Sequence, residues 1–329
     1  MQTEKLTNSG NIPILHVKGT TLPEVWERSV IDTWQQGVGI KTEYDKDTDP
    51  PSRDVTMVME IEKPFAEPRI HRCFPAGLEE LEIYRQEVVH GVHDSWINPQ
   101  EDKWSYTYHQ RLFAYDVIGS FSDALKGGPF DKVDQIEESI NGLVNHYYTR
   151  RAQAITWMPT VDTGHHEPPC LQRIWLRLLR VSENVYALNM NTHWRSRDAY
   201  KAAFMNMYAL TDLHKTIAKE LSKRMHANVT IGRYVDISDS YHIYGSYYEE
   251  FQANFLSLLE KRHFDERVWC TEDAEYFLAN GRIQLLNGKP GEPPLTHEHM
   301  RRIFSEIPKD QLSMVNEDVR KTIEEGNNT

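Results

Sequence analysis

Cysteine and long hydrophobic runs are both scarce in this sequence. The three cysteines, Cys73, Cys170 and Cys270, are odd in number and far apart. This usage excludes the disulfide framework of a small secreted domain and is typical of a reducing compartment, so we expect a cytoplasmic protein. The polar start of the chain lacks the pattern of a signal peptide. No run of about 18 apolar residues occurs, so we expect no membrane-spanning helix.

Basic charge is also in short supply. The sequence has 37 Lys and Arg against 49 Asp and Glu, a formal net charge of -12. A chain this acidic should repel polyanions, which argues against nucleic-acid binding through a broad basic face. A small phosphorylated ligand is still allowed, because a few local arginines can hold it.

The Rossmann and phosphate-loop glycine patterns are missing from the sequence. The histidines at 165–166 and 297–299 lack metal-site spacing, so we expect no metal.

The residues that are present are typical of a folded protein. Hydrophobic residues make up 39% of the chain, with eight Trp, sixteen Tyr and eleven Phe, which argues against disorder. Thr21 and Glu24 have capping-box spacing and predict a helix over residues 22–36 that Gly37 ends. Hydrophobic residues alternate over residues 55–61 and predict a half-buried strand.

Similar patterns predict the other elements. Helical periodicity recurs in four segments: residues 78–90, 132–148, 213–221 and 247–259. Alternation predicts two strands, over residues 174–178 and 186–190, joined by a polar turn. Helices and strands are mixed without regular βαβ alternation, so we expect an α+β domain.

Cys170 is the strongest candidate for chemistry. It follows Pro168 and Pro169 and precedes a predicted strand, so the thiol is presented at the start of the strand rather than inside it. An isolated cysteine is most often a buried, inert thiol. A reactive one needs positive neighbours, because little of a free thiol is ionised at neutral pH.

Two groups of arginines flank Cys170 in the sequence. Arg150 and Arg151 end the predicted helix before it, while Arg195 and Arg197 follow the second predicted strand after it. Adjacent surface arginines are usually only solvated charges. Guanidinium groups match phosphate oxygens, however, and several together can hold a phosphate dianion.

Taken in order, these residues resemble the thymidylate synthase superfamily, which includes the pyrimidine-nucleotide hydroxymethylases. The matching elements are Arg150-Arg151, Trp157, Pro168-Pro169-Cys170, Arg195-Ser196-x-Asp198, Asn206 and His242-x-Tyr244. The segments PPCLQ, YTYHQR and YTRRAQAITW resemble the archaeal-type members. The resemblance implies a thymidylate-synthase-like α+β fold, with a mixed central sheet flanked by helices and a homodimer joined sheet to sheet. The resemblance covers about residues 40–248. Residues 287–294 are rich in Gly and Pro, so we expect a catalytic domain over residues 1–294 and a C-terminal helical tail over residues 295–329.

The resemblance also implies roles for the matching residues. Cys170 would attack C6 of a pyrimidine nucleoside monophosphate, and Asn206 would hydrogen-bond the base. The other implied ligand contacts are phosphate binding by Arg53, Arg195, Ser196 and, from a second subunit, Arg150 and Arg151; sugar binding by His242 and Tyr244; and folate binding by Asp198 and Trp104, with Trp96 as the alternative shield.

Two further roles are implied but leave alternatives open. Glu87 is the preferred acid/base glutamate, and Glu79, Glu80 and Glu82 remain candidates because the spacing to Gly91 is shorter than the usual family pattern. Tyr108 is the preferred tyrosine near C5 of the base. Tyr106 is the alternative to it.

The implied chemistry is consistent with these residue types. Addition of a thiolate to C6 turns C5 into an enol-like carbon, which can attack an iminium form of 5,10-methylenetetrahydrofolate. An amide such as Asn206 can donate to the charge that develops on O4, and Glu, Tyr and water can remove the C5 proton. Hydride from the folate then gives a methyl group, whereas water gives a hydroxymethyl group.

Two departures from the common synthases concern the product. Leu171 stands where they have a histidine, and the chain continues past their short apolar terminus. Asn206 favours uracil, because the cytosine-specific pattern has Asp there. We therefore expect methylation of dUMP to dTMP, with hydroxymethylation of dUMP, dCMP or CMP as the alternative. The alternative from another class is a non-catalytic nucleotide-binding relative, which would not need Cys170.

Overall fold

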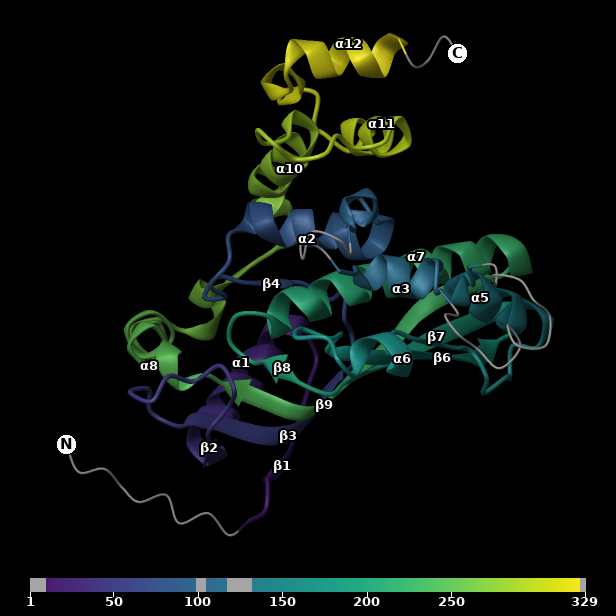
Figure 1. Ribbon diagram of the computed structural model, residues 1–329. Coiled ribbons are helices and arrows are strands. Elements are labelled where there is room, and N and C mark those ends of the chain that lie inside the picture. The colour runs from purple at the N-terminus through teal and green to yellow at the C-terminus, as the bar shows by residue number, and fades with distance from the viewer. Residues whose placement is uncertain (1–9, 99–104, 117–131, 326–329) are drawn as a thin grey trace.

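A mixed central sheet organises the chain, as expected. The computed structural model describes residues 10–98, 105–116 and 132–325 (Figure 1). Along the sheet, β1 pairs with β3 and β7 with β9 in parallel, and the other neighbours are antiparallel. Its strands in spatial order are β1 (Ile14–Gly19), β3 (Ser52–Ile61), β9 (Asn228–Ile243), β7 (Val185–Trp194), β6 (Leu171–Ser182) and β5 (Gln153–Ile155).

Four short strands complete the β-structure. β2 (Val38–Ile40) pairs with β3, and β8 (Arg197–Asp198) pairs with β9. β4 (Ile70–His71) and β10 (Val268–Trp269) form a separate antiparallel pair. The strands predicted around residues 55–61, 174–178 and 186–190 are all present, as β3, β6 and β7.

The helices of eight or more residues are α1 (Leu22–Gln36), α2 (Leu78–His90), α5 (Gln135–Asn145), α7 (Ala203–Met225), α10 (Thr271–Asn287), α11 (His297–Ser305) and α12 (Glu317–Glu325). Shorter helical segments are η1 (Asp94–Trp96), α3 (Tyr108–Phe113), α6 (Pro159–Asp162), η2 (Gly245–Tyr247), α8 (Tyr248–Glu250), η3 (Phe251–Leu256), α9 (Ser257–Lys261), η4 (Phe264–Arg267) and η5 (Leu312–Met314). Among the described residues no helix is both long and apolar enough to cross a membrane.

The helix predicted over residues 132–148 is shorter than expected. The Asp134 side chain accepts a hydrogen bond from the Glu137 backbone at 2.8 Å and caps α5. The helix stops at Asn145, and the Tyr147 ring then packs on Tyr186 of β7, with 5.3 Å between ring centroids. A local cap therefore marks the start of α5, and tertiary packing of Tyr147 follows its end.

The main core lies between one face of the sheet and the helices α1 and α7. Leu213, Ile217 and Leu221 of α7 are buried. Their four-residue spacing in the sequence predicted this helix. In Figure 1 the labelled helices lie on this side of the sheet. On the opposite face Val58, Ile237, His193 and Arg173 stand in one row across four strands. That face mixes half-buried hydrophobic and polar side chains.

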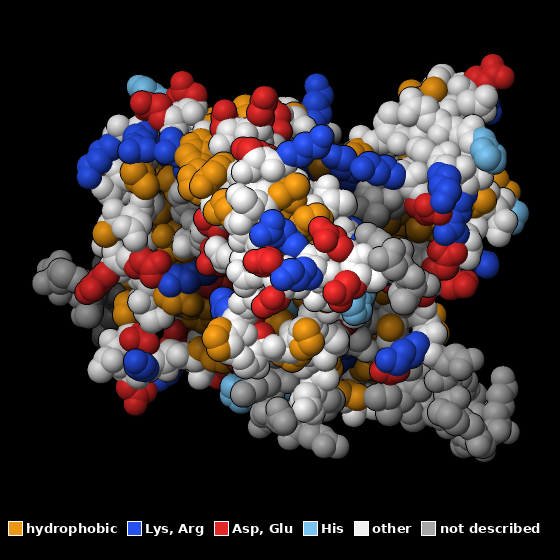
Figure 2. Space-filling view, turned by 90° about the horizontal axis from the view of Figure 1, so that it is seen from above, with side chains coloured by type: hydrophobic (Ala, Val, Ile, Leu, Met, Phe, Trp, Pro, Cys, Tyr) orange, Lys and Arg blue, Asp and Glu red, His pale blue; other side chains and the backbone are white. Residues whose placement is uncertain are grey.

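The helices α10, α11 and α12 stack beyond α2 and enclose a second hydrophobic cluster (Figure 1). A Cβ on Gly281 of α10 would lie 2.6 Å from the Glu79 backbone oxygen, so α10 and α2 can approach this closely because residue 281 is glycine. The buried Glu82 accepts from Arg85 at 2.6 Å and from Arg282 of α10 at 3.0 Å. Seen from above, acidic and basic side chains are intermingled on this face (Figure 2).

Candidate active site

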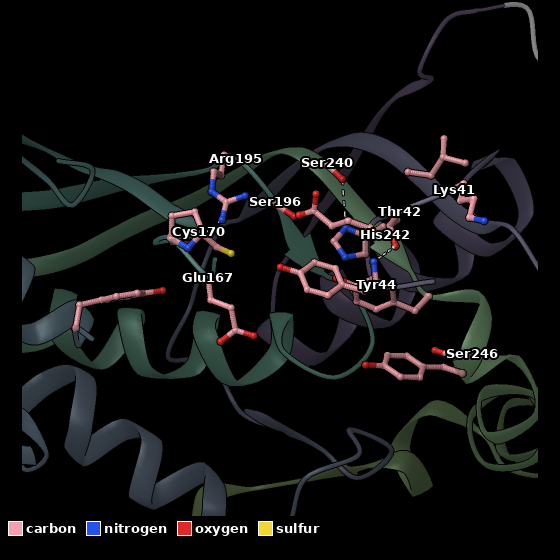
Figure 3. A pocket seen from close by; sticks show the side chains of 16 residues that line it. Lys41, Thr42, Tyr44, Glu167, Cys170, Arg195, Ser196, Ser240, His242 and Ser246 are labelled. Atoms are coloured by element: carbon pink, nitrogen blue, oxygen red, sulfur yellow. Dashed lines mark hydrogen bonds between the residues drawn. The ribbon is translucent and has the colours of Figure 1, made fainter. Parts of the chain in front are cut away.

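Among the residues singled out in the sequence, Cys170, Arg195, Ser196, His242 and Tyr244 line one cavity of about 780 Å³. In Figure 3, Cys170 and Arg195 lie on one side of this cavity, with Ser240 and His242 on the other. The remaining wall residues are Ile40, Lys41, Thr42, Glu43, Tyr44, Tyr106, Glu167, Pro168, Ser240, Ser246 and Tyr247. We call this space the cysteine cavity. The tertiary structure thus gathers residues from both halves of the chain.

The turn that carries Cys170 is fastened to Arg195. The Arg195 guanidinium donates to the Pro168 carbonyl at 2.6 Å and to the Pro169 carbonyl at 3.0 Å. The Arg195 backbone N–H donates to the Cys170 carbonyl at 2.9 Å. β6 begins at Leu171, so the thiol lies immediately before the strand, as the two prolines predicted.

The electrostatics of Cys170 are dominated by burial. Desolvation raises the pKa of the Cys170 thiol above its ordinary value of 9.0, and Glu167 adds to the increase. Arg195 and Arg197 act in the opposite direction without cancelling it. Positive neighbours are present, as the sequence suggested, yet the thiol stays protonated near neutral pH. A nucleophilic role for Cys170 would therefore require the thiol to lose its proton first.

Arg197 does not line the cavity. It is buried, forms an ion pair with Asp236, and donates to the Ala203 carbonyl at 2.7 Å. Its guanidinium lies 4.3 Å from the centre of the Trp194 ring. A buried arginine needs such partners, so the contacts of Arg197 indicate a structural role inside the fold.

The two candidate tyrosines occupy different positions. Tyr106 lines the cysteine cavity, whereas Tyr108 is not one of its wall residues. The centroids of their rings are 5.8 Å apart, and the Tyr108 hydroxyl accepts from the Leu171 backbone at 3.5 Å. Burial raises the pKa of both phenols, and Cys170 contributes to each increase. Both are near the thiol, with Tyr106 directly at the cavity.

Asn206 lies in the first turns of α7 and is nearly buried, at 8% exposure. Its Nδ2 donates to the Tyr84 hydroxyl at 2.6 Å. Tyr84 in turn lines a second cavity of about 600 Å³ between α2 and the C-terminal helices, which we call the helix cavity. Glu87 lines the same space, and its carboxylate lies 2.8 Å from Nδ1 of His93.

The four candidate glutamates are in clearly different surroundings. Glu82 is bound by Arg85 and Arg282, which lower the pKa of its buried carboxyl against the effect of desolvation. Glu79 and Glu80 are in the first turn of α2, at the opposite end from Glu87. Glu87 is one turn from Tyr84 on the same helix, and both line the helix cavity.

Arg53, Arg150 and Arg151 also lie outside the cysteine cavity in this chain. Arg53 donates to the Gly37 carbonyl at 3.1 Å, and its guanidinium lies 5.8 Å from the Trp34 ring centre. Because side chains alternate along a strand, the Arg53 side chain lies on the opposite face of the sheet from the side chain of Asp54. Arg150 and Arg151 are exposed beyond the end of α5. Trp104 lies outside the described residues.

Asp198 lies behind the cavity wall. Its Oδ1 accepts from the Tyr200 and Lys201 backbones at 2.9 and 2.8 Å. Burial raises the pKa of Asp198 to about 6, and Asp198 contributes to the raised pKa of two wall residues, Tyr244 and Tyr247. It is therefore close to them. Within the described part of the chain no group of three or more His, Cys, Asp or Glu side chains could hold a metal ion.

Sequence reasoning missed several residues of these sites. Tyr84 had a usable signal, because its three-residue spacing to Glu87 places both on one helix face. Asp54 and Ser240, described below, gave no local signal, because strand pairing brings them together. The loop with Lys41 and Tyr44 also contributes to the cavity wall without any motif.

Comparison with known proteins places these sites in context. Residues 78–268, more than half of the chain, match the family model described as thymidylate synthase. A protein of Methanococcoides burtonii is 28% identical over 228 residues, which are 69% of this chain and 88% of that protein. One from Methanocaldococcus jannaschii is 27% identical over 237 residues, covering 70% and 91%. Both are named "Putative thymidylate synthase".

A solved structure, thermostable thymidylate synthase A from Bacillus subtilis, matches 71% of this chain and 84% of its own, with a TM-score of 0.49 and 17% identity. The family match begins at α2 and ends at β10, so it contains the segment from Cys170 to Tyr244. The helices α10, α11 and α12 lie beyond it. On the extent of that match, the chain belongs to the thymidylate synthase family.

Proposed function

We propose that this protein transfers a one-carbon unit from 5,10-methylenetetrahydrofolate to C5 of a pyrimidine nucleoside monophosphate, converting dUMP to dTMP. The observation that carries the proposal is the cysteine cavity, in which Cys170, Arg195 and His242 meet from separate segments. A nucleophilic thiol beside a guanidinium suits a phosphorylated ligand with an electrophilic ring. A protein that only binds nucleotides has no use for the thiol.

The chemical step begins at Cys170. Its thiol adds to C6 of the base, the thiol proton passes to solvent, and C5 becomes the nucleophilic carbon. Arg195 and Ser196 bind the phosphate and hold the ring over the sulfur. Tyr106 keeps its proton, because burial raises its pKa, and therefore acts as a hydrogen-bond donor beside the thiol. Asn206 donates to the base oxygen where negative charge develops.

The helix cavity suits the one-carbon donor. Trp96, Ile83 and Leu285 are among the residues that offer apolar surface to planar rings, and Glu87 offers a carboxylate. The folate supplies the one-carbon unit and, for a methyl product, the hydride. Glu87 is our choice for the acid/base group, since it lines this cavity one turn from Tyr84 and Glu82 is paired with two arginines. Glu80 lines the same cavity from the first turn of α2 and is the alternative. Asp198 is proposed to contact the folate from the other side.

We also propose a homodimer joined through the open face of the sheet. The loop that carries Arg150 and Arg151 is anchored to that face. Trp175 Nε1 donates to the Arg150 carbonyl at 3.2 Å, and Arg177 donates to the Thr149 carbonyl at 2.9 Å. Neither arginine reaches the cavity of its own chain. A partner packed on this face would bring the pair towards its phosphate site.

The test is product identity. The protein is incubated with 5,10-methylenetetrahydrofolate and each of dUMP, dCMP, UMP and CMP, and the nucleotides are weighed by mass spectrometry. A methyl gain on dUMP, with release of dihydrofolate, is expected. A hydroxymethyl gain without dihydrofolate makes the protein a hydroxymethylase. No gain on any nucleotide, under conditions where one binds, contradicts the enzyme and favours the binding relative. Cys170→Ala is the negative control.

A further inference from the structure

His242 is held from behind by a short chain of hydrogen-bonding groups. Asp54 on β3 stands directly opposite His242 on β9. Ser240 Oγ donates to Asp54 Oδ1 at 2.9 Å. The same oxygen lies 3.2 Å from His242 Nδ1, as the dashed line in Figure 3 marks. The other ring nitrogen, Nε2, is buried and has no hydrogen-bond partner in the described structure. His242 lines the cysteine cavity, so Nε2 is the atom left for a ligand.

A change of strand register makes this arrangement possible. Val55 pairs with Tyr241, but Met57 pairs with Ser238, so two residues of β9 stand opposite Thr56. Such a bulge shifts the side-chain alternation of the strand. The Tyr241 side chain is fully buried, while Ser240 and His242 lie at the cavity. Without the extra residue in β9, the alternation of side chains would place Ser240 and His242 on the opposite face of the sheet, away from the cavity.

The direction of each hydrogen bond follows from the donors available. The Val55 and Tyr241 backbone N–H groups also donate to Asp54. An ionised carboxylate only accepts, so the single proton of the Ser240 hydroxyl points to Asp54. The Ser240 hydroxyl oxygen, 3.2 Å away, then accepts from Nδ1–H of His242, and a hydrogen bond from the ring to the Ser240 backbone supports the same proton position. A neutral imidazole has one N–H, which leaves a lone pair on Nε2.

The charge states agree with this assignment near neutral pH. Burial raises the pKa of Asp54 to about 6, so the carboxyl is largely ionised at pH 7 and above. Burial lowers the pKa of His242 to about 4, so its ring is neutral. The charge of Asp45 and a hydrogen bond with the Ser240 backbone act on the pKa of His242 in the opposite direction, and burial outweighs both. Lys41, Glu43, Glu167 and Arg195 are the charged groups that line the cavity around it.

We propose that Asp54 and Ser240 are positioning residues that hold His242 in its Nδ1–H tautomer, so that Nε2 accepts a hydrogen bond from a free hydroxyl of the nucleotide sugar. The identity of the ligand rests on the proposed function, whereas the tautomer rests on this geometry alone. The Tyr244 ring centroid lies 4.5 Å from that of His242. Burial raises the pKa of Tyr244, so its hydroxyl keeps a proton to donate.

This pair of groups specifies the chemistry of the ligand at that point. A hydroxyl can donate to Nε2 and accept from Tyr244 at the same time. A fluorine, an ether oxygen or a phosphate ester can accept but has no proton to give. The site therefore selects a nucleotide whose sugar hydroxyl is free.

The tautomer can be measured without any ligand or activity. Long-range proton–nitrogen correlation spectra of the full-length protein with isotope-labelled histidine distinguish a protonated ring nitrogen from an unprotonated one. His242→Gln identifies the signal of His242. Near neutral pH we expect Nδ1 to be protonated and Nε2 to carry the lone pair. A protonated Nε2 in the wild-type protein overturns the proposal, even if the enzyme methylates dUMP.

Binding measurements test the consequence. Wild-type protein should bind dUMP about tenfold more tightly than the analogue in which fluorine replaces the 3′-hydroxyl, as expected for one buried hydrogen bond. Ser240→Ala should bind the two nucleotides nearly equally, and Ser240→Thr, which keeps the hydroxyl, should restore the preference. Full preference in Ser240→Ala overturns the role of Ser240. Failure of every nucleotide to bind contradicts the proposed function, while the spectra of the free protein still decide the tautomer.

Discussion

The Nδ2 atom of Asn206 donates a hydrogen bond of 2.6 Å to the hydroxyl of Tyr84. This bond ties α7 to α2, the helix that carries Glu87. Burial raises the pKa of Tyr84, so its hydroxyl keeps its own proton while it accepts from the amide. The orientation of the Asn206 amide is thereby set from the side of the helix cavity. We expect base selection to depend on it.

Asn206→Asp should weaken turnover of dUMP and improve turnover of dCMP. A carboxylate accepts from the cytosine amino group, whereas the amide donates to the uracil oxygen. One misplaced buried hydrogen bond changes specificity by roughly fivefold to a hundredfold. The measurement is kcat/KM for both nucleotides, with Tyr84→Phe as a matched variant that removes only the support. A wild-type preference for dCMP would contradict the uracil assignment.

Cys170→Ala should abolish turnover and leave nucleotide affinity largely unchanged. In the proposed mechanism the thiolate acts in the chemical step, whereas the phosphate and sugar contacts provide most of the binding. Calorimetry gives the affinity, and product assays give the turnover. Cys270→Ala, at the N-cap of α10, is the matched control and should keep wild-type activity. Turnover of Cys170→Ala within tenfold of wild type would refute nucleophilic catalysis.

The alkylation rate of Cys170 in the free protein should rise with pH and show no plateau below pH 9. Burial raises its pKa above 9.0, so the reactive thiolate increases about tenfold per pH unit below that value. Mass spectrometry of the peptide that contains Cys170 separates its rate from those of the other cysteines. A plateau near pH 7 would mean that the arginines outweigh burial after all.

Mixing an Arg151→Ala chain with a Cys170→Ala chain should restore activity that neither has alone. In the hybrid dimer one site combines Cys170 of the first chain with Arg151 of the second. Activity per hybrid dimer should therefore approach half of that of the wild type. Two Cys170→Ala chains mixed in the same way are the control. No recovery in verified hybrids, or a monomer at micromolar concentration, would contradict the shared site.

Deleting residues 307–329 should divert the product from methyl towards hydroxymethyl. The deletion removes α12, whose Asp318, Val319 and Thr322 line the helix cavity, and lets water reach the intermediate. It keeps Glu306, which bonds to Arg85 and Gln86.

Val319→Glu is a milder test of the same wall, with the exposed Lys321→Glu on the same helix as its control. Val319→Glu should shift the product and Lys321→Glu should not. Unchanged methylation in the truncated enzyme would show that α12 does not exclude water.

The sequence by itself determined the elements whose signals are local. Three examples are the capping by Thr21, the four-residue spacing of Leu213 and Ile217, and the alternation along β3. Each depends only on neighbours within one element, so each can be recognised without the tertiary structure. The prolines before Cys170 likewise limit the backbone wherever the chain lies. The order of motifs from Arg150 to Tyr244 was therefore enough to indicate the family.

Only the tertiary structure decided which side chains meet. Strand register places Asp54 beside His242, and no local pattern encodes a pairing between residues so far apart. Helix packing separates Glu87 from Glu82, since α10 brings Arg282 against one carboxylate and leaves the other at a cavity. The pKa of Cys170 follows the same logic, because burial, which is set by the whole fold, outweighs the charges that the sequence reveals.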